Sequence, residues 1–460
     1  MSTPPDQCEH TCTLYQSDFP AAELAARRAR VLDGIGGEAV AILQGCGQVR
    51  GFQAFRQSNE FYYLCGVEVP HAYLLLDGST CRTTLYLPGP DDSRARNEGG
   101  DLTAESPEAI QRLTGVDALR APEALSEDVA GARVIFAPHS PAEGAMASRE
   151  VVQAADRGVA QDPWDGRPTR QARLLSLLSA CNPEAEVRDL CPLLDHLRAI
   201  KSPREVGLLR QAARLAGLAV MEAMRSTQPG VVEYQLAAVA NCIFLANGAR
   251  GEGYRSIVAG GPNAWYGHYW RNDCELEDGD LVLMDCAPDY RYYTSDIGRM
   301  WPVNGTYSPQ QRELYGFVVE YHKALLPRIR PGVMAAQIME EAAGEMARVV
   351  AGWSFSKRVY EEAARRMLEF TGHLSHPVGM AVHDVGGYHS RPLAPGVVFA
   401  VDPQMWVPEE KLYIRVEDTV VVTDTGSEVL TGVAPLDLGA VEALMQEEGL
   451  LQRMLPGLAA

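Results

Sequence analysis

The chain has 460 residues, 46% of them hydrophobic and 22% charged, and 60 acidic against 41 basic side chains give a formal net charge of −19. This length accommodates two or three domains with cores of their own, and the composition excludes a wholly disordered chain. The acidity argues against nucleic acid as a partner. Because there is neither an apolar run of about 20 residues nor a secretory signal, we expect a cytoplasmic protein with no membrane partner.

The first part of the chain alternates helical and strand-like segments. An amphipathic pattern predicts a helix over residues 20–32, and short apolar runs rich in β-formers follow it, at 39–44, 61–65, 72–77, 83–88 and 133–137. Turns rich in Gly and Pro separate these runs. The alternation predicts an α/β layer domain over residues 1–178, followed by a linker over 179–200. Cys8 and Cys12 frame a short polar segment near the start, which we do not expect to bind a metal.

Residues 201–460 show a different pattern of predicted elements, with long helices beside hairpin-like strands. Ser202 and Glu205 have the spacing of a capping box, and Pro203 stands at the first helical position, so a helix is expected to begin there. We expect helices at 203–226, 232–246, 309–326, 333–350 and 358–370. Strands are expected between 254 and 303 and between 378 and 423. This pattern predicts a second domain of the α+β class.

A pair of acidic residues stands out in the strand–turn–strand segment of residues 281–301. With the turn at residues 290 and 291, Asp285 would lie directly opposite Asp296 on the same face of the hairpin. Directly opposed residues have Cβ atoms about 4.5–5.5 Å apart, and two like charges there destabilise the sheet unless something compensates them.

The same arrangement recurs in residues 398–422. A turn at residues 409 and 410 would place Asp402 opposite Glu417. Each acid could instead pair with a nearby arginine, such as Arg299 or Arg415. Two opposed acidic pairs inside otherwise apolar strands nevertheless favour a bound cation.

Histidine supplies a further type of ligand, in residues 372–387, GHLSHPVGMAVHDVGG. Four carboxylates and one imidazole form an oxygen-rich set that suits Mn²⁺, Co²⁺, Fe²⁺ or Zn²⁺. The number of ligands fits two ions bridged by carboxylates and a hydroxide. The sequence therefore predicts a metal centre of hydrolytic type.

These segments resemble the signatures of the pita-bread metallopeptidases, the family of aminopeptidase P, prolidase and methionine aminopeptidase. The first signature is similar to DGDLVLMDCAPDYRYYTSDIGRMWPVNGTYSPQQRELY, the second to HLSHPVGMAVHDVG and the third to RVEDTVVVT. FRQSNEFYYLCGVEVPHAYLLLDG resembles the creatinase-like domain that precedes the catalytic domain in aminopeptidase P and prolidase. The resemblance covers about residues 20–440. It implies a creatinase-like α/β N-terminal domain and an α+β pita-bread catalytic domain over 201–460.

The resemblance also implies a role for each candidate ligand. Asp285 would chelate one metal ion, and Asp296 and Glu417 would bridge the two ions. His376 and Asp402 would complete the ligands of the second ion. The expected cofactor is two divalent ions per chain, with Mn²⁺ first and Co²⁺, Zn²⁺ or Fe²⁺ as alternatives.

Further residues are matched to the surroundings of the reaction centre. His268 would contact the substrate or shuttle protons, His383 would lie near the leaving side of the scissile bond, and Glu417 would manage the proton. Arg415 would bind substrate or orient a carboxylate. Tyr388 belongs to a set of aromatic residues compatible with a pocket for proline, the others being Tyr254, Trp265, Tyr266, Tyr269, Trp270 and Trp406.

The implied function is that of a homodimeric exopeptidase for short peptides at Xaa-Pro bonds, of the aminopeptidase P or prolidase type. A hydroxide bridging the two metals would attack the peptide carbonyl. Two alternatives remain open. One keeps the metal site with a different specificity, as a non-proline dipeptidase or a carboxypeptidase. The other is a metal-free pseudo-peptidase that binds peptides or proteins.

The chain departs from the family pattern at one candidate ligand. Asp402, Pro403 and Gln404 stand where the family usually has Glu-Pro-Gly. Because aspartate is one methylene shorter, its carboxylate reaches about 1.5 Å less far, which bears on metal affinity and metal choice. The spacing of 15 residues from Asp402 to Glu417 also resembles that of the dipeptidases.

Overall fold

The computed structural model describes residues 16–49, 51–99, 102–105 and 107–454. The segment from Cys8 to Cys12 lies outside them. The chain divides into two compact units, the first ending at Leu197 and the second beginning at Arg198. Within the described residues, no helix has both the length and the apolar character needed to cross a bilayer.

The first unit is built on a mixed six-stranded sheet in the order β4-β3-β2-β1-β5-β6. The central pairs β1–β2 and β2–β3 are antiparallel and the other three pairs are parallel. The strands are β1 (Ala39–Gln44), β2 (Tyr73–Asp77), β3 (Arg82–Tyr86), β4 (Ala118–Arg120), β5 (Val134–Ala137) and β6 (Glu186–Asp189). The helices are α1 (Ala21–Ile35), α2 (Asn59–Cys65), α3 (Asp92–Glu98), α4 (Pro107–Thr114), α5 (Leu125–Val129), α6 (Arg149–Gln161), α7 (Arg170–Cys181) and α8 (Cys191–Ala199). The predicted α/β class is confirmed.

The prediction of a strand over 61–65 is wrong, because this run forms most of the buried helix α2. The hydroxyl of Ser58 accepts a hydrogen bond from the Phe61 amide at the start of the helix. Gly66 ends it in the left-handed conformation with φ 69°. Every residue of the helix is buried, so its aromatic side chains pack on all sides. Packing and capping together override the β-propensity of the aromatic residues.

The second unit carries an antiparallel sheet in the order β10-β13-β9-β8-β7, with β14 paired to β13, and a separate two-stranded sheet of β11 and β12. The strands are β7 (Ile257–Gly260), β8 (Leu281–Asp285), β9 (Ile297–Pro302), β10 (Val398–Val401), β11 (Gln404–Val407), β12 (Leu412–Arg415), β13 (Glu417–Val422) and β14 (Ser427–Val429). Strands β8, β9, β10 and β13 are buried over nearly their whole length. These four buried strands form a rigid support that fixes the positions of the polar side chains at their ends.

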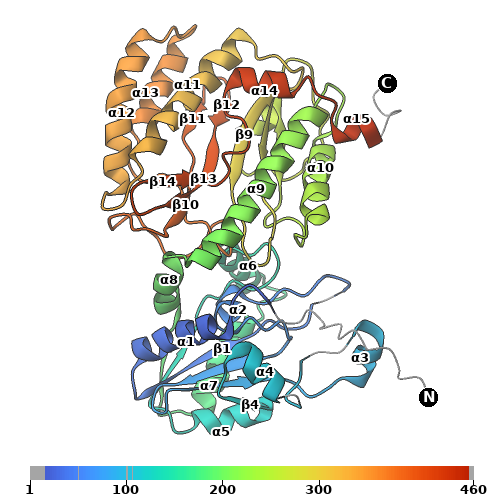
Figure 1. The fold of residues 1–460 in the computed structure, drawn as a ribbon, viewed down its shortest axis with the longest axis vertical. Coiled ribbons are helices and arrows are strands. Elements are labelled where there is room, and N and C mark those ends of the chain that lie inside the picture. The colour runs from blue at the N-terminus through green and yellow to red at the C-terminus, as the bar shows by residue number, and fades with distance from the viewer. Residues whose placement is uncertain (1–15, 50, 100–101, 106, 455–460) are drawn as a thin grey trace, which may run out of the picture. The chain divides into compact units, whose positions relative to one another are not determined.

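Helices cover this sheet, and α11, α12 and α13 run side by side (Figure 1). The helices are α9 (Pro203–Ser226), α10 (Glu233–Ala246), α11 (Pro309–Leu325), α12 (Ala335–Gly352), α13 (Arg358–Glu369), α14 (Leu438–Leu444) and α15 (Leu450–Met454). The predicted capping box is present, since Ser202 and Glu205 each bind the other's backbone amide through their side chains. The α+β class of this unit is confirmed.

The register of the first acidic hairpin differs from the prediction. Asp285 lies opposite Gly298 rather than Asp296. The turn falls one residue later than expected, at Arg291 and Tyr292, whose φ values of 52° and 72° are those of a tight two-residue hairpin turn. When the turn moves by one residue along the chain, the partner of each strand residue moves by two residues. Asp296 therefore stays on the predicted face but becomes a diagonal neighbour of Asp285.

The register of the second hairpin is the predicted one on both sides of its acidic pair. Val401 pairs with Asp418 between β10 and β13, and Gln404 pairs with Arg415 between β11 and β12. Asp402 and Glu417 stand at the point where the hairpin leaves one sheet for the other. The prediction succeeds here because no residue is inserted in either strand between the two sheets. The register counted from the turn therefore holds in both sheets.

Candidate metal centre

Three candidate ligands come together where β9 and β13 begin beside the loop that precedes β10. The ligand atoms of Asp296, His376 and Glu417 all lie within 4.8 Å of one another. His376 Nε2 is 3.3 Å from Asp296 Oδ2 and 3.8 Å from Glu417 Oε1. The other ring nitrogen, Nδ1, is 3.2 Å from the carbonyl oxygen of Pro377, which fixes the orientation of the ring.

A glycine makes room for this group in the sheet. Gly298 pairs with Asp285 on one side and with Glu417 on the other. A Cβ atom at this position would lie 3.0 Å from the Glu417 Cβ and 3.2 Å from Arg415 Nε. Glycine therefore allows the side chains to converge over the strand.

Asp285 joins the cluster through a tyrosine hydroxyl. The Tyr254 oxygen is 2.5 Å from Asp285 Oδ1 and 2.8 Å from Asp296 Oδ1. Sequence reasoning placed Tyr254 only among the aromatic surroundings and missed its contact with the carboxylates. Tyr254 stands 31 residues before Asp285, outside either hairpin, so no local pattern indicated this contact.

Arg415 lies among the remaining carboxylates and is itself buried. Its Nη2 donates a hydrogen bond to Asp285 and is 3.4 Å from Glu417 Oε2, and its Nη1 is 3.7 Å from Asp402 Oδ2. The structure thus brings the five predicted ligands, Asp285, Asp296, His376, Asp402 and Glu417, to one cluster. Arg299 turns away from it and pairs with Asp418.

Burial and mutual repulsion determine how the carboxylates ionise. Burial, reinforced by the charge of Asp296, raises the pKa of Asp285 and of Glu417. Burial also raises the pKa of Asp402, against the opposing charge of Arg415. For Asp296, burial acts in the same direction, but the hydrogen bond and charge of His376 outweigh it and lower the pKa. The raised pKa values of Asp285, Asp402 and Glu417 indicate that the nearby positive groups do not fully compensate the negative charge of the cluster.

Two carboxylate oxygens of the cluster lack a hydrogen bond. Asp402 Oδ1 and Glu417 Oε2 are buried and accept none from the described residues, although Glu417 Oε2 keeps its ion-pair contact with Arg415 at 3.4 Å. Leaving a buried carboxylate oxygen without a partner is costly. The oxygen-rich donor set with one imidazole suits Mn²⁺, Fe²⁺, Co²⁺ or Zn²⁺. The residues present therefore fit a divalent metal centre.

The outer histidines continue the cluster from His376. The rings of His376 and His383 have centroids 4.0 Å apart, and those of His383 and His268 lie 5.9 Å apart. Tyr388 is placed differently, since it is buried and its hydroxyl bonds the backbone nitrogen and oxygen of Ser375. These hydrogen bonds support the loop that carries His376 and do not involve the carboxylates.

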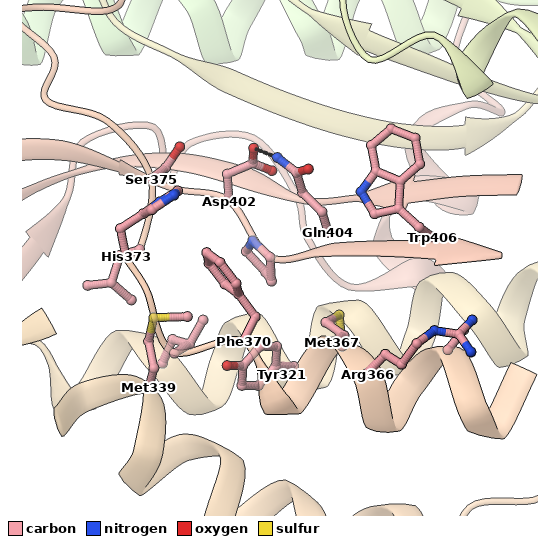
Figure 2. A pocket seen from close by; sticks show the side chains of 14 residues that line it. Tyr321, Met339, Arg366, Met367, Phe370, His373, Ser375, Asp402, Gln404 and Trp406 are labelled. Atoms are coloured by element: carbon pink, nitrogen blue, oxygen red, sulfur yellow. Dashed lines mark hydrogen bonds between the residues drawn. The ribbon is translucent and has the colours of Figure 1, made fainter. Parts of the chain in front are cut away.

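A cavity of about 490 Å³ opens beside Asp402 (Figure 2). Asp402 and Gln404, joined by a hydrogen bond, lie at one side of it. Its apolar side is formed by α11, α12, α13 and the residues after them, including Tyr321, Met339, Met367 and Phe370. Trp406 stands at its edge and meets Trp265 edge to face at 5.1 Å. Sequence reasoning did not assign Gln404 to the site.

Comparison with known proteins places this geometry in a family. Residues 207–424 match metallopeptidase family M24, and residues 24–133 match the aminopeptidase P N-terminal domain. The chain is 32% identical over 427 residues to the Xaa-Pro aminopeptidase of Escherichia coli, covering 85% of this chain and 89% of that protein. It is 30% identical over 453 residues to the Xaa-Pro aminopeptidase of Haemophilus influenzae, covering 94% and 99%.

Solved structures agree with these matches. Aminopeptidase P from Escherichia coli with the inhibitor Pro-Leu has a TM-score of 0.75 and 28% identity, covering 94% of this chain and 99% of that one. The zinc-substituted form of that enzyme in complex with product has a TM-score of 0.76 and 29% identity, with the same coverage.

The chain belongs to metallopeptidase family M24. It is a two-domain member, with an aminopeptidase P N-terminal domain ahead of the pita-bread domain, which confirms the resemblance found in the sequence. Family and relatives together identify it as a hydrolase of the exopeptidase type. The family and the Asp296–His376–Glu417 cluster also indicate that it depends on metal.

Proposed function

We propose that the chain is a metal-dependent Xaa-Pro aminopeptidase, which removes the N-terminal residue of short peptides when proline follows it. The observation that carries this proposal is the cluster of four buried carboxylates and one histidine. This cluster lies in a chain whose relatives are named Xaa-Pro aminopeptidases.

In this proposal the five clustered side chains hold two divalent ions, Mn²⁺ first and Co²⁺, Zn²⁺ or Fe²⁺ as alternatives. Asp285 would help to hold one ion and His376 and Asp402 the other, while Asp296 and Glu417 would be shared between the two. Bound ions of this kind polarise a peptide carbonyl and lower the pKa of water.

The remaining chemistry falls to side chains around the cluster. Glu417, whose carboxylate lies in the cluster, would accept the proton of the attacking water. His268 and His383 lie outward of His376 and stabilise charge on the peptide or protonate the leaving amine. Arg415 orients the carboxylates that it contacts. Tyr388 contributes to substrate binding through the loop that it supports, because its hydroxyl is bonded to the backbone of Ser375.

A panel of peptides of two to five residues, with proline at each position in turn and with free or blocked ends, tests the specificity. We expect release of the first residue only when proline is second and the N-terminus is free. Cleavage restricted to dipeptides would support a dipeptidase. Release from the C-terminal end would contradict an aminopeptidase.

Metal analysis tests the cofactor. We expect about two ions per chain in protein loaded with Mn²⁺, loss of cleavage after chelation, and recovery on adding Mn²⁺ back. Less than one ion per chain, with no cleavage under any cation, would support a metal-free pseudo-peptidase. We also propose that the protein is a homodimer, which light scattering tests, and that it is cytoplasmic, which cell fractionation tests.

A further inference from the structure

We propose that Gln404 is a positioning residue for Asp402, which it holds so that a single carboxylate oxygen faces the metal. This inference rests on the proposed function, because it assumes that Asp402 is a ligand. Gln404 stands where the resembling family usually has glycine, so the device belongs to this chain and does not follow from the family pattern.

The two oxygens of Asp402 have different surroundings. Oδ2 accepts a hydrogen bond from Gln404 Nε2 (Figure 2). The same oxygen is 3.7 Å from Arg415 Nη1. Oδ1 is buried and has no hydrogen-bond partner among the described residues. The donors thus gather on one oxygen and leave the other available to a cation.

The backbone explains why Gln404 can act in this way. Gln404 begins β11 and pairs directly with Arg415 on β12, so the two donors are held at neighbouring positions of one small sheet. Pro403 separates Gln404 from Asp402. The spacing of two residues lets the amide fold back onto the carboxylate while the backbone of β11 stays paired.

The shorter side chain of Asp402 gives this contact its importance. An aspartate reaches about 1.5 Å less far than a glutamate, and the terminal torsion of a carboxylate is only weakly fixed by itself. A hydrogen bond to one oxygen fixes that torsion, so less freedom is lost when the metal binds. Partners that orient a ligand are typically worth 10–100-fold in metal affinity.

The test titrates metal-free protein with Mn²⁺ and follows free Mn²⁺ by its electron paramagnetic resonance signal. We expect Gln404→Ala to weaken one class of Mn²⁺ site by about 10–100-fold and to leave the other class within about twofold. The matched control is Gln337→Ala, since Gln337 is an exposed glutamine on α12 that bonds Glu341. This control should bind as the unaltered protein does.

A double variant decides whether Gln404 acts through Asp402. Asp402→Glu in the Gln404→Ala background restores the longer side chain, and we expect it to recover most of the lost affinity. Circular dichroism and the midpoint of thermal unfolding check that each variant is folded.

Unchanged Mn²⁺ affinity in folded Gln404→Ala would overturn the positioning role, as would a double variant that binds no better than the single one. A failure of the unaltered protein to bind Mn²⁺, Co²⁺, Zn²⁺ or Fe²⁺ would instead overturn the proposed function, and the positioning role with it. The binding curve of the unaltered protein separates these outcomes.

Discussion

At the scale of single residues, Arg415 is the fixed positive charge that stabilises the carboxylate cluster when no metal is bound. The guanidinium is buried and contacts Asp285, with Glu417 and Asp402 within 4.0 Å. Without it the four buried carboxylates would repel one another more strongly, and the pKa values of Asp285, Asp402 and Glu417, which its charge holds down, would rise further. Bound metal ions supply the same kind of charge, so Arg415 and metal should partly replace each other in stabilising the fold.

We therefore expect Arg415→Met to cost about 3–5 kcal/mol of unfolding free energy in metal-free protein, and clearly less at saturating Mn²⁺. Urea unfolding in chelator and in Mn²⁺ measures both values. Arg365→Met is a matched control, because its pair with Glu361 is exposed and should contribute less than about 1 kcal/mol. An equal loss in chelator and in Mn²⁺ would show that Arg415 is only a packing residue.

At the scale of elements, the sequence predicted the strands correctly where their hydrophobic pattern is clear. The strands that carry the ligands are apolar runs, and the register of the second hairpin could be counted from one turn because Val401–Asp418 and Gln404–Arg415 share it. The register of the first hairpin differs from the prediction because Arg291 and Tyr292 adopt positive φ at the turn. Neither residue type favours that conformation, so the sequence did not indicate it. Tyr254 and Gln404 were missed because their contacts depend on tertiary packing.

Helix α11 carries a titratable group into the core of the second unit. His322 is fully buried, with its Nε2 at 3.3 Å from Asp418 Oδ2. Burial lowers the pKa of His322 to about 4, and the charges of Arg299 and Lys323 act in the same direction while Asp418 opposes them. The unfolded chain has the ordinary value near about 6.5. The contribution to stability is therefore complete above pH 6.5 and is lost as the pH falls towards 4.

We expect the coupling of His322 protonation to unfolding to lower the unfolding free energy by roughly 2–3 kcal/mol between pH 7 and pH 4.5. This value follows from the difference between the pKa of His322 in the folded and in the unfolded chain. Urea unfolding of metal-free protein at the two pH values measures this loss. His322→Gln, which does not titrate, should lose less stability over the same range, whatever its stability at pH 7. A pH dependence identical to that of the unaltered protein would show that His322 does not control acid sensitivity.

At the scale of the whole molecule, all five predicted ligands lie in the unit that begins at Arg198. Metal should therefore stabilise this unit directly, while the first unit, built on its own six-stranded sheet, contains none of the five. Ions that bind only the folded state at about 100 times their dissociation constant add roughly 2.7 kcal/mol. For a domain of this size, the increase corresponds to a shift of roughly 5–10 °C in the unfolding midpoint.

Tryptophan fluorescence can assign that shift to one unit, because Trp164 is the single tryptophan before Arg198 and is fully exposed. In Trp164→Phe every tryptophan reports on the second unit. We expect chelation to lower the fluorescence midpoint of this variant by roughly 5–10 °C and to leave a calorimetric transition of the first unit in place. If chelator moved every transition equally, the two units would unfold as one cooperative block. If it moved none, the carboxylate cluster would not bind metal in the folded protein.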